Sequence, residues 1–293
     1  MLYRRKIIIQ VLNAFDMRLD KINLMKLLLI LGIEEGVECY DFVPYKMGCF
    51  SFTAYADLRA MHREKLIQET ENFITLNKFD ETLYEIKDKD KEAIDRLSCR
   101  FRNTSKEKLI SYTYNKFPYY ASKSTLKNFI SPQLKEKIQT IAPSNKGIVL
   151  YTIGYEGKSL EKYFNCLIQN GIKTLIDVRK NSISMKYGFS GSTLKNCAES
   201  LGIKYEHMPS LGIVSSKRKD ISTFDDYQKL FSDYEATTIK NNSKYLKEIL
   251  NILVQDKAIA ITCFEADSNY CHRSRVAKHI TKLPGWQYEV AHL

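Results

Sequence analysis

Residues 147–157 read GIVLYTIGYEG, and this stretch decides the fold of the C-terminal half. The apolar run Ile148–Ile153 is typical of a strand that is buried on both faces of a parallel sheet. Gly154–Gly157 form a turn, and the spacing of apolar residues over 160–168 predicts an amphipathic helix. A strand, a turn and a helix in this order predict the first unit of an alternating α/β domain.

The same alternation continues to the C-terminus. We predict further strands at residues 174–179, 203–208 and 258–263, and helices at residues 194–201, 224–240, 245–254 and 276–280. This order predicts a mainly parallel, Rossmann-like sheet flanked by helices. A seam rich in Pro, Ser and Asn, Ala142–Gly147, precedes it. We therefore predict an α/β catalytic domain over residues 147–293.

The N-terminal region, residues 1–142, has a different pattern. Apolar residues over 22–31 have mostly helical spacing, a second helix is indicated at 53–63, and residues 66–76 suggest a short hairpin. Helices followed by a hairpin are the order of a winged helix, a common DNA-binding module. A small α+β accessory or dimerisation domain would produce a similar pattern. We predict a mostly helical, winged-helix-like domain.

The charge of the chain favours polyanionic partners. Its 45 Lys and Arg against 34 Asp and Glu give a formal net charge of +11, which attracts nucleic acid first. Basic stretches at residues 91–102 and 105–116 lead to Phe117–Tyr120, a combination that suits a phosphate-tracking surface with stacking rings. A solvated helix face beside an aromatic core explains it equally well. We predict double-stranded DNA as the partner and leave a homodimer open.

The sequence gives no sign of a membrane or a secretory route. The first apolar run, Ile7–Val11, is too short for a membrane span, and no cleavage site of small residues follows it. The seven cysteines are an odd set without a Cys-x-x-Cys pair, which fits free thiols in a reducing compartment. We expect a cytoplasmic protein with no membrane partner, no cofactor and no metal site.

Polar residues follow each predicted strand of the C-terminal domain. They are Gly154 and Tyr155 after the first strand, Asp177 and Arg179 at the end of the second, Tyr205 and His207 in the third, and Cys263, Glu265, Cys271, His272 and Arg273 after the strand near the C-terminus. The carboxyl ends of parallel strands share one edge, where ligands bind. We therefore expect these residues to form one crevice.

The residue types in this crevice point to hydrolysis. Asp177 and Glu265 are candidates for a carboxylate pair, in which one activates water and the other stabilises positive charge. Arg179 and Arg273 offer planar forks that bind a phosphate or a carboxylate. A buried structural ion pair of Asp177 with Arg179 is the architectural alternative.

Cys271 and His272 are the further catalytic candidates. They open the last predicted helix, where unpaired N–H groups favour an anion. That position would lower the pKa of Cys271 and make it a better nucleophile. Cys263 ends a buried strand, so packing in the core is its alternative role. His272 next to Cys271 could ligate a metal, but no further ligand pair at regular spacing supports such a site.

These motifs carry a resemblance to a known family. TIGYEG at 152–157, DVR at 177–179, YEH at 205–207 with LG at 211–212, and CFE to CHRS over 263–274 resemble the bacterial and archaeal domain family of unknown function numbered 488. The similarity covers residues 147–293. The N-terminal half, with YKMG at 45–48 and FPYY at 117–120, looks like a winged-helix-like extension of some larger members.

Two positions depart from the pattern of that family. Asn181 or Ser182 stands where a proline is usual, and Ser184-Met185 stands where a Ser-Arg pair is usual. If the family's arginine holds an anion, Lys186 would substitute for it less rigidly. We therefore include Ser184 and Lys186 among the candidate substrate-binding residues.

The resemblance implies a shared active-site-like crevice without a settled activity; members are suspected of acting on nucleic acid, including modified DNA in phage defence. From the residues, we predict a DNA-acting hydrolase that cleaves the N-glycosidic bond of bases, with an extruded base stacked on Tyr155 or Tyr205. The alternatives are a DNA-binding regulator whose crevice binds a small anion without turnover, a nuclease, and a thiol enzyme that uses Cys271 or Cys263.

Overall fold

The computed structural model describes residues 1–143, 147–218, 221 and 223–293. The chain divides into two compact units, Met1–Ala142 and Pro143–Leu293. Residues 144–146 of the predicted seam lie outside the described residues. Of the helices in the described ranges, none has both the length and the apolar character that crossing a membrane requires.

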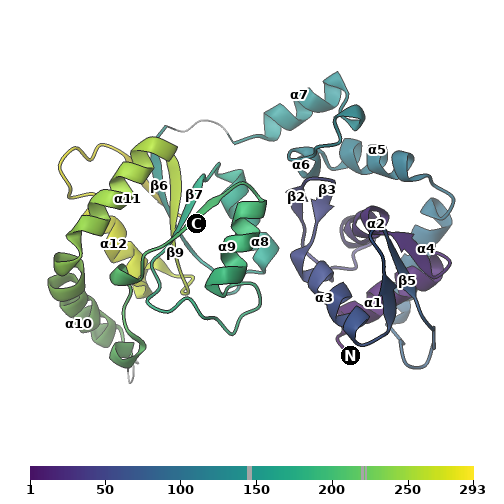
Figure 1. Cartoon of the computed structure of the whole chain (residues 1–293), viewed down its shortest axis with the longest axis horizontal. Helices are drawn as coiled ribbons and strands as arrows, with labels where there is room; N and C mark the ends of the chain where they lie inside the picture. The colour runs from purple at the N-terminus through teal and green to yellow at the C-terminus, as the bar shows by residue number, and fades with distance from the viewer. Residues whose placement is uncertain (144–146, 219–220, 222) are drawn as a thin grey trace. The chain divides into compact units, whose positions relative to one another are not determined.

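The first unit is mostly helical, as predicted (Figure 1). Its elements are α1 (Tyr3–Ala14), β1 (Arg18–Asp20), α2 (Lys21–Glu34), β2 (Val43–Tyr45), β3 (Gly48–Phe50), α3 (Phe52–Arg63), β4 (Ile67–Glu69), β5 (Phe73–Leu76), α4 (Asp88–Phe101), α5 (Lys106–Lys116), α6 (Pro118–Ala121), η1 (Lys127–Phe129) and α7 (Pro132–Ile141). An antiparallel sheet has the strand order β1-β5-β4, and β2 pairs with β3 in a separate hairpin.

Helices α1 and α2 supply most of the core of this unit. The runs Ile7–Ile9 and Leu27–Leu31 are buried and pack in one cluster with apolar residues of α3, α4 and the sheet. Asp20 caps α2, because its side chain accepts a hydrogen bond from the backbone N–H of Ile22.

The second unit contains a parallel sheet flanked by helices, which confirms the predicted fold class of this half. Its strands are β6 (Val149–Gly154), β7 (Thr174–Asp177), β8 (Lys204–His207), β9 (Ala258–Cys263) and β10 (Glu289–His292), in the order β10-β6-β9-β7-β8. Each neighbouring pair is parallel. The sequence did not lead us to expect β10.

Helices cover both faces of this sheet. They are α8 (Leu160–Gln169), α9 (Gly191–Ser200), α10 (Phe224–Tyr234), the π-helical η4 (Glu235–Ile239), α11 (Ser243–Asp256) and α12 (His272–Ile280), with short 3-10 turns η2 (Pro209–Leu211), η3 (Ser215–Arg218) and η5 (Ser268–Tyr270). Ile259 and Ile261 of β9 pack with the apolar side of α10–α12. Thr262 points the other way and accepts a hydrogen bond from Tyr163 of α8, on the side where Figure 1 shows α8 and α9.

The strand order determines which loops become neighbours. β9 lies between β6 and β7, so the segment that follows Cys263 emerges between the segments that follow Gly154 and Asp177. The carboxyl end of β8, at His207, is aligned with Asp177 in the next position along the edge. The polar residues of the sequence motifs therefore gather at one edge of the sheet, where ligands bind in open α/β folds.

Candidate functional site

Asp177 and Arg179 form a buried, bidentate ion pair at the end of β7. The Arg179 Nη2 and Asp177 Oδ2 atoms are 2.5 Å apart, and Nε donates to both carboxylate oxygens at 2.9 and 3.0 Å. The side chains are 7% and 0% exposed. Burial acts to lower the pKa of Arg179, but the hydrogen bonds and charge of Asp177 outweigh it and raise that pKa. The carboxylate is thus enclosed and holds the guanidinium through both of its oxygen atoms.

The other side of the Arg179 guanidinium fixes an aromatic pair. Its Nη1 donates to the hydroxyl of Tyr155 and to the carbonyl of Phe189, both at 2.8 Å. The rings of Tyr155 and Phe189 are stacked with centroids 4.4 Å apart, and both residues are buried. Tyr155 therefore stacks on Phe189 here, and the face that was expected to receive an extruded base is covered.

Two residues from β8 complete this network. The hydroxyl of Tyr205 donates to Oδ2 of Asp177 at 2.7 Å, and burial together with the charge of Asp177 raises the pKa of Tyr205. His207 Nε2 lies 2.9 Å from the carbonyl oxygen of Arg179, to which it donates. His207 is exposed, whereas Tyr205 is half-buried.

The loop between β7 and α9 carries Ser184 and Lys186. Lys186 Nζ donates to the carbonyl of Tyr155 at 2.7 Å and lies over the Phe189 ring. Ser184 Oγ accepts a hydrogen bond from the backbone N–H of Lys186. Both side chains organise the loop, and neighbouring Met185 is fully exposed.

Gly154 and Arg273 hold the segment that follows β9. A Cβ atom at Gly154 would overlap the carbonyl of Glu265, so only glycine allows this close approach. The Arg273 guanidinium donates to the carbonyls of Glu265 and Ala266 and is fully buried. Gly154 and Arg273 therefore position the backbone at Glu265, and the buried guanidinium of Arg273 is not exposed to solvent.

Cys263, Cys271 and His272 form a compact buried cluster beside Glu265. Their Sγ and ring nitrogen atoms all lie within 4.8 Å of one another, and the Cys263 Sγ to His272 Nδ1 distance is 3.5 Å. The Cys263 thiol also donates to Oε2 of Glu265 at 3.3 Å. His272 Nε2 donates to the carbonyl of Val178 at 3.0 Å. Glu265 itself is only partly buried.

The thiol of Cys271 differs from the sequence-based expectation. Cys271 does cap the N-terminus of α12, but its side chain is completely buried. Burial, reinforced by the neighbouring Cys263, raises its pKa well above the ordinary value. The expected lowering of this pKa is therefore wrong, because loss of hydration outweighs the helix terminus.

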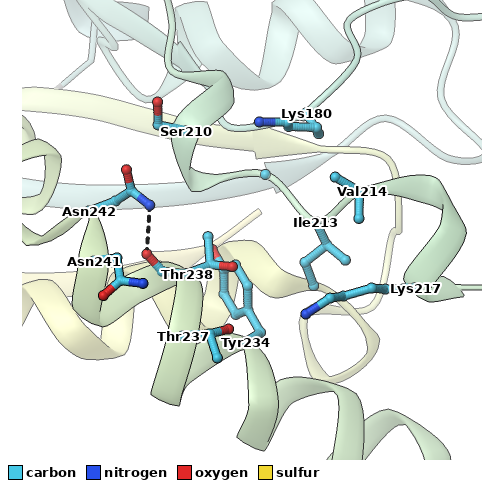
Figure 2. A pocket seen from close by; sticks show the side chains of 11 residues that line it. Lys180, Ser210, Ile213, Val214, Lys217, Tyr234, Thr237, Thr238, Asn241 and Asn242 are labelled. Carbon is cyan, nitrogen blue, oxygen red and sulfur yellow. Dashed lines mark hydrogen bonds between the residues drawn. The ribbon is translucent and has the colours of Figure 1, made fainter.

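A polar pocket of about 400 Å³ opens where the chain leaves β7 and β8 (Figure 2). It is lined by Lys180, Ser210, Gly212, Ile213, Val214, Lys217, Tyr234, Thr237, Thr238, Asn241 and Asn242. The ammonium group of Lys180, the hydroxyls and the amides suit a polar, anionic ligand. The second ammonium group, on Lys217, is paired with Asp233 at 2.6 Å. The floor includes part of η4, and π-helical turns of this kind are frequent at functional sites.

Tyr234 connects this pocket to the cysteine–histidine cluster. Its ring stands edge-on to His272, with centroids 5.7 Å apart, and its hydroxyl donates to the carbonyl of Leu211 at 2.5 Å. Gly212 passes so close to the backbone of Lys180 that a Cβ atom there would overlap it. The sequence motif LG at 211–212 thus shapes one wall of the pocket.

The structure brings the predicted residues into two connected groups. The first contains Tyr155, Asp177, Arg179, Lys186, Tyr205 and His207, and the second contains Gly154, Cys263, Glu265, Cys271, His272 and Arg273. Sequence reasoning missed Phe189, Lys180 and Tyr234. Phe189 lies just before α9, and Tyr234 is the last residue of α10. Both are buried aromatic residues, and only their contacts distinguish them from ordinary core residues.

One comparison with known proteins gives a match, and it lies in the C-terminal unit. None of the curated proteins and none of the solved structures matches this chain. The model of one protein family matches the segment from α8 to α12, which contains most of the candidate site residues. Residues 159–280 match the family model described as Domain of unknown function DUF488, which confirms the resemblance of the C-terminal half to that family.

Proposed function

We propose that this protein is a DNA-acting hydrolase that cleaves N-glycosidic bonds, with Glu265 as its catalytic carboxylate. The observation that carries the proposal is the contrast between the two candidate carboxylates. Asp177 is 0% exposed and is occupied by Arg179 and Tyr205, whereas Glu265 is partly exposed at the same edge of the sheet. A carboxylate must reach the substrate to activate water or to stabilise a sugar cation.

Asp177 then has a positioning role. Its ion pair with Arg179 fixes Tyr155 and the carbonyl of Phe189, and Lys186 holds Tyr155 from the other side. The network therefore fixes Tyr155, which contacts Phe264 next to Glu265, without contacting the reacting atoms. Breaking it would disturb substrate placement and stability together.

The surroundings of Glu265 suit a nucleotide. Phe264 precedes it, is 42% exposed and touches the edge of Tyr155 with ring centroids 5.3 Å apart. An extruded base would stack on Phe264, because Tyr155 is covered by Phe189. The pocket beside Lys180 offers an ammonium group and amide groups to a flanking phosphate.

The first unit would hold the duplex as a winged helix. In support, α1, β1, α2, α3, β4 and β5 occur in the order of that module, with the β2–β3 hairpin inserted between α2 and α3, and β5 lies between β1 and β4. Positive charge is concentrated elsewhere in the unit. Residues 102–142 contain eight Lys and Arg and two Asp and Glu, a net charge of +6, whereas residues 1–101 carry a net charge of −1. We therefore place phosphate contacts on α5 to α7.

The decisive experiment incubates the purified protein with unmodified DNA, DNA with modified bases, and RNA. Products are separated with and without alkali, which breaks the strand at sites that have lost a base. We expect alkali-dependent breaks in DNA that disappear in Glu265→Gln. Glu206→Gln, which changes an exposed carboxylate on β8, is the matched control and should keep full activity. Equal activity in Glu265→Gln would refute the assigned carboxylate, and direct breaks would indicate a nuclease.

A second candidate function follows from the pocket alone. Its polar lining, with Lys180, Lys217 and the Asn241–Asn242 pair, suits a small anionic ligand held without turnover (Figure 2). The protein would then be a DNA-binding regulator. This reading predicts DNA affinity that changes when a nucleotide is added, with no product on any of the three substrates.

A further inference from the structure

The geometry points to a metal site of the zinc class, formed by Cys263, Cys271 and His272, with its fourth position facing Glu265. The three ligand atoms come from the end of β9 and the start of α12 and lie within 4.8 Å of one another. Zinc prefers thiolate and imidazole ligands such as these, whereas magnesium and calcium prefer oxygen ligands. The sequence alone led us to expect no metal site.

One distance in the cluster tests the geometry directly. Zn–S bonds of about 2.3 Å and Zn–N bonds of about 2.0–2.1 Å at a tetrahedral angle place sulfur and nitrogen roughly 3.5–3.6 Å apart. The Cys263 Sγ to His272 Nδ1 distance is 3.5 Å. A direct thiol–imidazole hydrogen bond has a similar length, so the distance supports the site only together with the third ligand, Cys271.

The histidine has the outer partner that metal-binding histidines usually have. His272 Nε2 donates to the carbonyl oxygen of Val178 at 3.0 Å, so in the neutral ring Nδ1 carries the lone pair. Nδ1 is the nitrogen that faces the thiols. A backbone carbonyl in this role fixes the tautomer and the ring orientation.

The scaffold holds the ligands rigidly. Cys263 is the last residue of a buried central strand, and Cys271 precedes α12 with an extended backbone, at φ −123° and ψ 136°. That conformation turns the side chains of Cys271 and His272, which are neighbours in the chain, toward a common point. All three ligand residues are at most 2% exposed, and such sites lose little entropy on binding.

Glu265 is partly exposed and lies beside the buried ligand residues, so we place the fourth coordination position on its side of the cluster. Oε2 of Glu265 is 3.3 Å from Cys263 Sγ, but Glu265 lies outside the mutually close set of ligand atoms. A water molecule in the fourth position would therefore hydrogen-bond to Glu265 rather than be replaced by it. Zinc lowers the pKa of such a water to about 7. This use of the water rests on the proposed hydrolase function, whereas metal binding does not.

Metal binding is tested on the full-length protein, stripped of metal by a chelator under reducing conditions. We expect one zinc ion per chain, with release of about two protons as the thiols deprotonate. Cobalt should give thiolate charge-transfer absorption and the visible bands of a tetrahedral ion. Both measurements use the wild-type protein and so do not depend on the folding of any variant.

Variants then assign the ligands. Cys263→Ser and Cys271→Ser should each weaken zinc binding by more than the roughly 10–100-fold that loss of an outer-shell partner causes. Cys166→Ser, which removes a thiol from α8, is the matched control and should bind as the wild type does. Glu265→Gln should still bind zinc. If this variant loses activity but keeps zinc, metal binding by the cysteines and His272 is separate from the catalytic role of Glu265. Wild-type protein that takes up no stoichiometric zinc, or cobalt without thiolate bands, would overturn the proposal.

Discussion

The hydroxyl of Tyr205 donates to Oδ2 of Asp177 at 2.7 Å, across the two strands at the outer side of the sheet. The same oxygen accepts a hydrogen bond from Arg179. A residue of β8 thereby shares the ion pair that ends β7. Because Arg179 in turn holds Tyr155 after β6, one carboxylate ties together β7, β8 and the segment that follows β6.

This shared carboxylate predicts a large effect on stability. We expect Asp177→Ala to lower the free energy of unfolding of the second unit by about 3–5 kcal/mol, because Arg179 would be left buried without its partner. Tyr205→Phe removes one hydrogen bond and should cost about 1–2 kcal/mol. Urea unfolding, followed by the fluorescence of Trp286, measures both. Equal costs for the two variants would contradict the assigned arrangement.

Gly154 provides a test of how Glu265 is positioned. In Gly154→Ala the added methyl group would overlap the carbonyl of Glu265, so the segment after β9 must shift. We expect a loss of stability of about 1–3 kcal/mol, as for other overpacked sites, and a larger proportional loss of activity than of substrate binding. Gly202→Ala meets no atom within 4 Å but has a φ of +75°. Its cost of about 1–2 kcal/mol measures backbone strain alone.

The sequence predicted β6, β7 and β9 well because these strands are buried and mostly apolar, with turns between the elements. It did not predict β10, whose residues are partly exposed and not strongly apolar. The motif residues at the ends of β6, β7 and β9 could be placed on one edge from strand alternation alone. Their contacts could not. That Asp177 is enclosed and Glu265 is partly exposed depends on the packing of Arg179 and Arg273. Spacing in the sequence does not encode that both arginines are buried.

The error over Cys271 has the same origin. Its place at the start of a helix is readable from the sequence, and that place alone lowers a thiol pKa. Burial raises the pKa of Cys271, and this effect is larger than that of the helix terminus. The degree of burial is determined by the segments that cover Cys271, which its position in the sequence does not reveal. Likewise, Cys263 and His272 are nine positions apart, and no spacing rule indicated that their side chains meet.

The first unit contains a buried carboxylate whose removal should make stability depend less on pH. Asp57 on α3 accepts hydrogen bonds from Arg4, Arg5 and Tyr40. Burial acts to raise its pKa, but the two guanidinium groups outweigh burial and lower it. Because the pKa of Asp57 is lower in the folded state, its ion pairs add stability at pH values above the unfolded-state pKa of about 3.9. This stability is lost as the pH falls through the folded-state pKa.

We therefore expect Asp57→Asn to lower the free energy of unfolding at pH 7 by about 2–4 kcal/mol, less than for an enclosed pair because Arg4 is partly solvated. The difference from wild type should shrink as the pH is lowered below about 4. Circular dichroism during urea unfolding, repeated from pH 7 to pH 3, measures this. A constant difference across that range would show that the ion pairs contribute no pH-dependent stability.

DNA binding through α5 predicts a specific salt dependence. Lys108 and Lys116 are exposed and lie two turns apart on one face of that helix, around a shallow hollow that also includes Tyr112. Each phosphate contact contributes a slope of about −0.9 to the dependence of log K on log salt concentration. Replacing both lysines by alanine should therefore make the slope shallower by about 1.8 and weaken binding similarly for all DNA sequences.

The control for this prediction is the double variant Lys89→Ala with Lys91→Ala, which removes the same charge from α4. Lys91 is paired with Glu81, so this variant should leave the slope unchanged. Fluorescence anisotropy from 50 to 200 mM salt resolves a difference of this size. If the α4 pair changed the slope and the α5 pair did not, the phosphate contacts would lie in the neutral part of the unit, and its positive segment would have another role.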